Sequence, residues 1–170
     1  WFIILKKLMK SRINFFLIIA IILMLIQISL GISVREFIDN QIDILGFEKK
    51  DFWLNKPELN FYIHRTFSLL VFLSNFYLFF LAKKSKIDLK FIKMINFLIL
   101  FEIIIGASMY YFSFPILTQP IHLLISIFIL SLQFYWLLKL RKPYWFLAFH
   151  DSHNLILNNW KIFLELLPLT

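Results

Sequence analysis

The stretch INFFLIIAIILMLIQISL, residues 13–30, contains no charged side chain and decides the fold class. A helix of about 20 apolar residues crosses a hydrocarbon layer about 30 Å thick. Three further stretches are long and apolar enough to do the same, at residues 59–81, 91–112 and 116–138. Basic residues precede the first stretch, as in a signal peptide, but its apolar run is too long, so we expect an uncleaved helix. The sequence predicts an all-α membrane protein with a bundle of four transmembrane helices in residues 1–142.

The composition favours the same class. Hydrophobic residues make up 61% of the 170 residues, and phenylalanine alone supplies 22, more than one small soluble core could bury. The chain has no cysteine, which excludes a disulfide, an iron–sulfur cluster, a thiol nucleophile and cysteine-bound zinc. The sequence also lacks the Gly-rich phosphate loop and the G-x-S-x-G motif, so it gives no sign of a soluble nucleotide site or a serine hydrolase.

Basic residues are unevenly distributed between the predicted loops. Lys and Arg are retained on the cytoplasmic side of a membrane. Twelve of them precede the first span, join the second span to the third, or follow the fourth: Lys6, Lys7, Lys10, Arg12, Lys83, Lys84, Lys86, Lys90, Lys93, Lys139, Arg141 and Lys142. We therefore predict that both termini are cytoplasmic. The net charge of +8 is a topology signal, and without a soluble basic domain it gives no support to nucleic-acid binding.

Two histidines, His64 and His122, lie about one turn into the second and fourth predicted spans. In the predicted topology both helices run from the outer side inward, so the two imidazoles share nearly the same depth, close to the outer surface. Each belongs to a polar stripe within an arc of about 80° or about 60°. The stripes are Asn60, His64, Ser68 and Asn75 in one helix and Gln119, His122, Ser126 and Gln133 in the other. Because polar side chains avoid lipid tails, both stripes are expected to face the bundle interior.

A histidine inside a membrane span is a candidate functional residue. Two at equal depth on different helices suit the two faces of a haem iron, which takes axial histidines from neighbouring helices. Zinc fits less well because it needs three or four protein ligands. The alternative is that each histidine is a hydrogen-bonded packing residue between helices. The residues favour His64 and His122 as axial ligands of a haem iron.

Three motifs resemble those of haem A synthases, membrane enzymes that convert haem O to haem A for cytochrome oxidase. LGISVREFID at residues 30–39 is similar to the stretch that follows the first helix of a repeat in that family. FYIHRTFS at 61–68 resembles its histidine–arginine helix, and QPIHLL at 119–124 resembles a later helix. The motifs occur in the family's order and cover roughly residues 27–136. Members of the family have two similar four-helix halves, so the resemblance is to one half.

The resemblance favours the carboxy-terminal half, which in the family holds a haem b cofactor between its two histidines. The amino-terminal half handles the substrate haem and carries a glutamate three residues before its first histidine, and that position is Phe61 here. The catalytic residue therefore stays unassigned. A homodimer would lack this glutamate in both copies, so a separate amino-terminal half chain is the favoured partner. Trp1 stands in place of an initiator methionine, and we expect a fragment or one product of a split protein.

The resemblance also implies an activity. The reaction is oxidation of the methyl group of haem O to the formyl group of haem A, an oxidoreductase chemistry in which the cofactor makes the bonds. The implied environment is the lipid bilayer of a bacterial plasma membrane, and the implied pathway includes haem O synthase and cytochrome oxidase assembly. Two other functions stay open. One is a b-type cytochrome subunit for electron transfer or anchoring without haem-oxidising activity, and the other is a cofactor-free helical adaptor.

Three charged residues near the predicted site have two interpretations each. Arg35 and Arg65 are candidates to bind haem propionates, because a guanidinium matches a carboxylate bidentately. Alternatively, Arg65 reaches the lipid headgroups, and Arg35 forms a salt bridge with Glu36 or Asp39. Glu102 lies within the third span, and for it we favour a hydrogen bond to another helix over a role in proton movement, because it lies deeper than the histidines.

Two segments lie outside the predicted spans. The connection at residues 31–57 is longer than a hairpin and is expected to form a lid or docking surface over the outer site. The tail at 143–170 is expected to lie in the cytoplasm or along the cytoplasmic membrane surface. It carries His150 and His153, which we expect to be solvated, because their spacing is not that of the H-E-x-x-H zinc motif. In the third span, Gly106 is expected to permit close helix approach.

Overall fold

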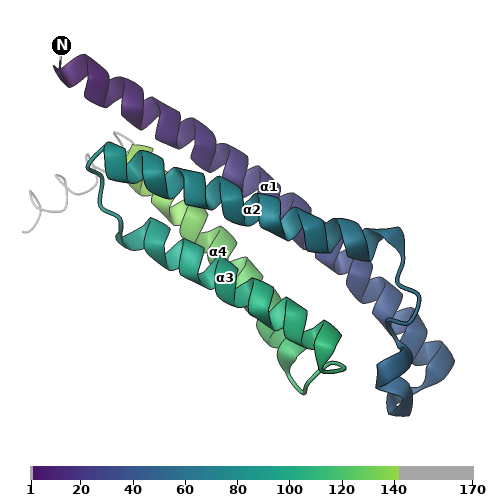
Figure 1. Ribbon diagram of the computed structural model, residues 1–170. Helices are drawn as coiled ribbons and strands as arrows, with labels where there is room; N and C mark the ends of the chain where they lie inside the picture. The colour runs from purple at the N-terminus through teal and green to yellow at the C-terminus, as the bar shows by residue number, and fades with distance from the viewer. Residues whose placement is uncertain (1, 142–170) are drawn as a thin grey trace, which may run out of the picture. The chain divides into compact units, whose positions relative to one another are not determined.

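The computed structural model describes residues 2–141, with side chains from residue 8 onward. The helices follow one another along the chain (Figure 1): α1 Phe2–Leu45, the 3-10 helix η1 Phe47–Phe52, α2 Leu59–Lys84, α3 Lys90–Tyr111 and α4 Thr118–Arg141. Within the described residues, the four α-helices are each long and apolar enough to cross a membrane, which confirms the predicted all-α class with four candidate spans. The chain divides into two compact units, residues 1–137 and 138–170. The predicted tail, with His150 and His153, lies outside the described residues.

Helix α1 is much longer than the span predicted within it. The stretch at 13–30 forms only its middle, and the helix continues to Leu45. The prediction of a connection from residue 31 to 57 was therefore wrong for its first half. At 1.5 Å per residue, 44 helical residues extend about 66 Å, whereas the hydrocarbon layer is about 30 Å thick. Helix α1 therefore reaches beyond the hydrocarbon layer.

Local interactions favour helix in this extension although it carries charges. Arg35 forms an i, i+4 ion pair with Asp39, with 2.5 Å between Nη2 and Oδ1, and Ile38 between them is buried. The helix ends at Gly46, which has a positive φ of 82° and donates its N–H to the carbonyl of Ile42. Glycine adopts this conformation without steric cost. What remains between α1 and α2 is a short connection around η1 and the buried Trp53.

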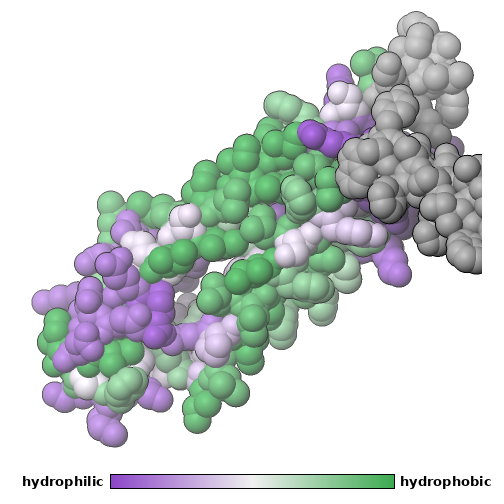
Figure 2. Space-filling model, turned by 180° about the vertical axis from the view of Figure 1, so that it is seen from behind, coloured by the Kyte–Doolittle hydropathy of each residue, from purple (hydrophilic) through white to green (hydrophobic). Residues whose placement is uncertain are grey.

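The helices bury apolar stripes against one another. Helix α2 lies along α1, and α3 lies along α2 (Figure 1). The buried residues of α1 recur every three or four positions: Ile13, Leu17, Ala20 and Met24. Helix α3 buries Ile92, Ile95 and Ile99 at the same spacing, which is the spacing of one helix face. Figure 2 shows an extensive hydrophobic surface on the outside, with hydrophilic residues gathered over the end of α1 and η1.

A buried polar seam joins three of the helices. Asn75 on α2 and Gln133 on α4 have no exposed surface, and the Gln133 amide donates to Oδ1 of Asn75 at 2.9 Å. Asn96 on α3 donates to the backbone carbonyl of Asn75 at 3.2 Å. The predicted polar stripes of α2 and α4 thus face inward and meet, as expected for polar groups that cannot pair with lipid.

Candidate functional site

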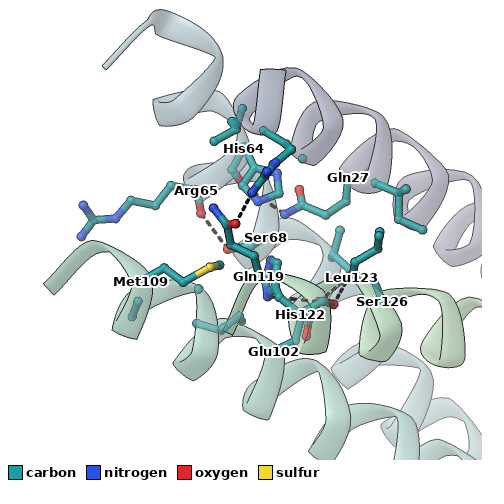
Figure 3. Close-up of a pocket in the computed structure, with 18 of the residues that line it drawn as sticks. Gln27, His64, Arg65, Ser68, Glu102, Met109, Gln119, His122, Leu123 and Ser126 are labelled. Carbon is teal, nitrogen blue, oxygen red and sulfur yellow. Dashed lines mark hydrogen bonds and ion pairs between the residues drawn. The ribbon is translucent and has the colours of Figure 1, made fainter. Parts of the chain in front are cut away.

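A cavity of about 760 Å³ lies among the four helices, near the starts of α2 and α4. Most of its lining is apolar. Its polar lining side chains come from all four helices. They are Arg35 and, labelled in Figure 3, Gln27, His64, Arg65, Ser68, Glu102, Gln119, His122 and Ser126. Cofactor sites in proteins are typically apolar cavities of roughly 300–1,000 Å³ with a few convergent polar groups. This cavity has the size and the character of such a site.

The two predicted ligands meet in this cavity. His64 is the sixth residue of α2 and His122 the fifth of α4, so both stand at the same end of their helices. Their ring centres are 6.4 Å apart and the ring planes are inclined by 75°. Both side chains are half-buried. The structure therefore brings together the two histidines that the sequence singled out.

This arrangement fits a metal held between two imidazoles. Metal–nitrogen bonds of about 2 Å on either side, plus the depth of the two rings, place the ring centres about 6 Å apart. The Nδ1 atoms of His64 and His122 are buried and have no hydrogen-bond partner in the described part of the chain. Two imidazoles on neighbouring helices are also the donor set of a haem iron with axial histidines. The residues present thus fit a haem.

A glycine lies against each histidine ring. A Cβ atom built on Gly31 of α1 would stand 3.2 Å from Cε1 of His64. A Cβ on Gly106 of α3 would stand 3.4 Å from Cε1 of His122. Gly106 was predicted to let two helices approach, and the group it leaves room for is this imidazole. Two of the three glycines of the chain therefore border the site.

Glu102 contacts the site, although it was not among the predicted ligands or propionate-binding residues. This carboxyl on α3 is 8% exposed and accepts a hydrogen bond from Ser126 of α4. Its Oε1 atom is also 3.2 Å from Nδ1 of His122, close but not aligned as a hydrogen bond. The predicted bond to another helix is confirmed, but the prediction that Glu102 lies far below the histidines was wrong. Counting equal distances from the end of α3 at Tyr111 and the start of α4 at Thr118 pairs residue 102 with 127. This symmetry places Glu102 near Ser126 but does not fix its contact with His122.

The two arginines differ in their surroundings. Arg35 forms the predicted ion pair with Asp39 and also donates to the side chain of Gln119 on α4, so it links α1 to α4 beside the cavity. Arg65 lies over the ring of Tyr110, 5.6 Å from its centre, and its guanidinium extends away from the histidines (Figure 3). Both residues line the cavity. Binding of propionates by either one stays a prediction.

Phe61 also lines the cavity. Its ring stacks on Tyr110 of α3, with 5.6 Å between centres and 30° between planes. The position that carries a glutamate in the substrate half of haem A synthases is therefore apolar and packed here. Within the described part of the chain, Glu102 is the only acidic residue that lines the cavity.

Comparison with protein families finds a match over most of the chain. The model of the family described as cytochrome oxidase assembly protein (COX15-CtaA) matches residues 4–134, about three quarters of the chain. The matched region includes both histidines and all three sequence motifs. Comparisons with curated proteins and with solved structures found no match.

Proposed function

The chain belongs to the cytochrome oxidase assembly protein family, which has a role in haem A synthesis, and on that premise we propose that it binds a haem b between His64 and His122. It acts as one half of a haem A synthase, the enzyme that oxidises the methyl group of haem O to the formyl group of haem A. One observation carries the proposal. Two half-buried imidazoles on different helices face a cavity of about 760 Å³ with their ring centres 6.4 Å apart.

Different residues of the cavity would bind different parts of this cofactor. His64 and His122 would hold the haem iron, and Gly31 and Gly106 leave room for their rings. When bound, haem supplies one-electron chemistry at its iron, which the protein tunes through the axial ligands and burial. The apolar lining keeps water from the iron. Arg35 is the favoured cation for a propionate, because it already bridges two helices at the cavity.

The substrate step belongs to another four-helix unit. Phe61 cannot take part in proton transfer, and it stacks on an aromatic ring where the substrate half has a glutamate. We therefore assign this chain the cofactor half, with electron transfer as its role. Haem O, supplied by haem O synthase, binds to an amino-terminal half that is the partner of this chain or part of the same longer protein.

The distribution of charge supports an orientation for the site. Lys83 and Lys84 end α2, Lys86 lies in the connection and Lys90 begins α3, so this basic cluster stands at the opposite end of α2 from His64. Basic connections stay in the cytoplasm. The haem thus lies near the outer surface of a bacterial plasma membrane, and both termini are cytoplasmic.

A second function, a b-type cytochrome subunit, is favoured by one observation. Phe61 removes the carboxylate that the substrate half needs, while the two histidines persist. Such a subunit would transfer electrons to a partner enzyme without oxidising haem O. Co-expression with an amino-terminal half of a haem A synthase separates the two functions, because haem A forms in the first case and not in the second.

Spectroscopy of the detergent-purified chain tests haem binding. We expect one haem b per chain by pyridine haemochrome, with the six-coordinate low-spin spectrum of two nitrogen ligands. His64→Ala and His122→Ala each abolish the low-spin signal, because each removes one ligand. His153→Ala serves as the matched control and leaves the spectrum unchanged. A colourless wild-type chain, expressed with excess haem, would contradict the proposal and favour a cofactor-free helical adaptor.

A further inference from the structure

Three groups converge where α3 meets α4. Glu102 is buried and accepts a hydrogen bond from Ser126, and the same carboxyl oxygen is 3.2 Å from Nδ1 of His122. Ser126 lies one turn after His122, and its single hydroxyl hydrogen is shared between Glu102 and the backbone carbonyl of His122, which is 3.0 Å away. Figure 3 shows the three side chains gathered on one side of the cavity. Ser126 thus holds the carboxyl beside the imidazole.

The other histidine has no such neighbour. Nδ1 of His64, like Nδ1 of His122, is buried without an aligned hydrogen bond in the described part of the chain, but no carboxylate of that part forms an ion-pair contact with it. Gln27 of α1 donates to the backbone carbonyl of His64 at 3.2 Å, which anchors the main chain and leaves the ring nitrogens untouched. The two imidazoles therefore face one another across the cavity in unequal surroundings.

The chemistry of a carboxyl next to an imidazole decides where the imidazole proton lies. A neutral imidazole carries one N–H, on either Nδ1 or Nε2, and an ionised carboxylate can only accept a hydrogen bond. As a carboxylate, Glu102 beside Nδ1 of His122 therefore favours the proton on Nδ1. The lone pair of Nε2 is then free for a metal. Such a contact also raises the basicity of a ligating histidine.

We propose that Glu102 is a positioning residue that fixes His122 in the tautomer with the proton on Nδ1, and that it makes His122 the stronger electron donor of the two axial ligands. The second part rests on the proposed haem binding, whereas the first concerns the chain without haem. The contact between Glu102 and His122 is within hydrogen-bond distance but not aligned. Hydrogen bonds at such sites are often poorly aligned before the ligand binds and tighten on binding.

Nitrogen-15 NMR of selectively labelled histidines tests the tautomer in the haem-free chain. We expect His122 to be held with its proton on Nδ1, and Glu102→Gln to relax it to a mixture, because an amide can donate as well as accept. The signals of His64 stay unchanged. Glu36→Gln is the matched control, since this exposed glutamate on α1 does not line the cavity. An unchanged His122 tautomer in Glu102→Gln would overturn the proposal.

The reduction potential of the haem-loaded chain tests the second part. Glu102→Gln weakens electron donation by His122 and so favours ferrous over ferric haem. We expect the ratio of ferric to ferrous affinity to change by about tenfold, which is about 59 mV for a one-electron couple. A residue that only packs α3 against α4 would change stability and leave the potential where it was. An unshifted potential in Glu102→Gln would overturn this part.

Chemical rescue shows whether the effect runs through His122. His122→Gly leaves a space that imidazole or 1-methylimidazole can fill, and a metal-bound 1-methylimidazole has no N–H to donate to Glu102. With imidazole as the ligand, we expect Glu102→Gln to shift the reduction potential as it does with His122. With 1-methylimidazole, we expect Glu102→Gln to leave the potential unchanged. An equal shift with both ligands would contradict the assignment.

The outcomes separate this inference from the proposed function. If the wild-type chain binds haem through both histidines and Glu102→Gln changes neither the tautomer nor the potential, the proposed function stands and the role of Glu102 is contradicted. If the wild-type chain is colourless but its His122 tautomer depends on Glu102, the positioning role of Glu102 stands and haem binding is contradicted.

Discussion

The helix pair α1–α2 and the helix pair α3–α4 each provide one half of the site, and the two halves share one feature. In each pair the first helix carries a glycine, Gly31 or Gly106, and the second carries the histidine whose ring lies against it. The pairs then diverge. His64 is bordered by the closer glycine. Neither Nδ1 atom has an aligned hydrogen bond within the described part of the chain, but Nδ1 of His122 has Oε1 of Glu102 at 3.2 Å.

This difference shows that two equivalent ligands can be oriented by different forces. On the α1–α2 side the fit is steric, because the space beside Gly31 limits where the His64 ring can lie. On the α3–α4 side a buried carboxyl adds an electrostatic preference. A steric restraint acts on the ring as a whole, while a hydrogen bond also selects one of its nitrogens.

The largest expected effect comes from filling the space beside one ring. Gly31→Ala places a Cβ 3.2 Å from Cε1 of His64. Without haem the ring can move into the cavity, but a bond to iron holds it in place, so the clash appears on binding. We expect haem binding to weaken by about 1–3 kcal/mol, the usual cost of overpacking, measured by haem titration.

Gly106→Ala is the matched control for this change. Its Cβ meets His122 at 3.4 Å, an ordinary contact, and alanine is the better helix former. Haem affinity should therefore stay within about twofold of wild type, since the contact needs no movement of the ring. Equal losses from Gly31→Ala and Gly106→Ala would show that the two rings are held in the same way.

An intermediate effect is expected where the two pairs are tied together. Gln133→Leu removes the hydrogen bond to Asn75 and should destabilise the chain by about 0.6–1.7 kcal/mol, as measured for polar contacts between membrane helices. The haem spectrum stays unchanged, because the seam lies outside the cavity lining. Unfolding in mixed micelles measures the loss. Ser131→Ala is the control, since the hydroxyl of this exposed serine donates to a carbonyl of its own helix, α4. A loss of low-spin haem in Gln133→Leu would show that the polar seam and the haem site are not independent.

The smallest expected effect concerns the arginines. Arg35→Lys keeps the charge but loses the planar fork that serves Asp39 and Gln119. We expect a stability change of about 0.2–1 kcal/mol, typical of an exposed ion pair, with haem affinity reduced severalfold if Arg35 binds a propionate. Arg65→Lys should change haem affinity less, because that guanidinium extends away from the histidines. Haem titration of the two variants side by side tests this order, and a larger loss from Arg65→Lys would reverse the assignment.

The residues themselves were enough to predict the four spans and the polar stripes. Apolar length predicts a membrane helix, and a period of 3.6 residues places Asn75 and Gln133 on the same faces as His64 and His122. Those faces do meet, in the seam and at the cavity. Both features depend on the order of residues within one helix, so the linear sequence contains them.

The relative heights of neighbouring helices depend on packing between distant segments, which cannot be read from the residue order within one helix. Glu102 meets His122, and Gly31 and Gly106 meet the two rings, only because the helices slide and cross at particular heights. The continuation of α1 to Leu45 was likewise hidden, since charges at Arg35 and Asp39 resemble a loop until their pairing is seen. The helical period determines which face a side chain occupies, whereas many weak contacts between distant segments determine what stands opposite it.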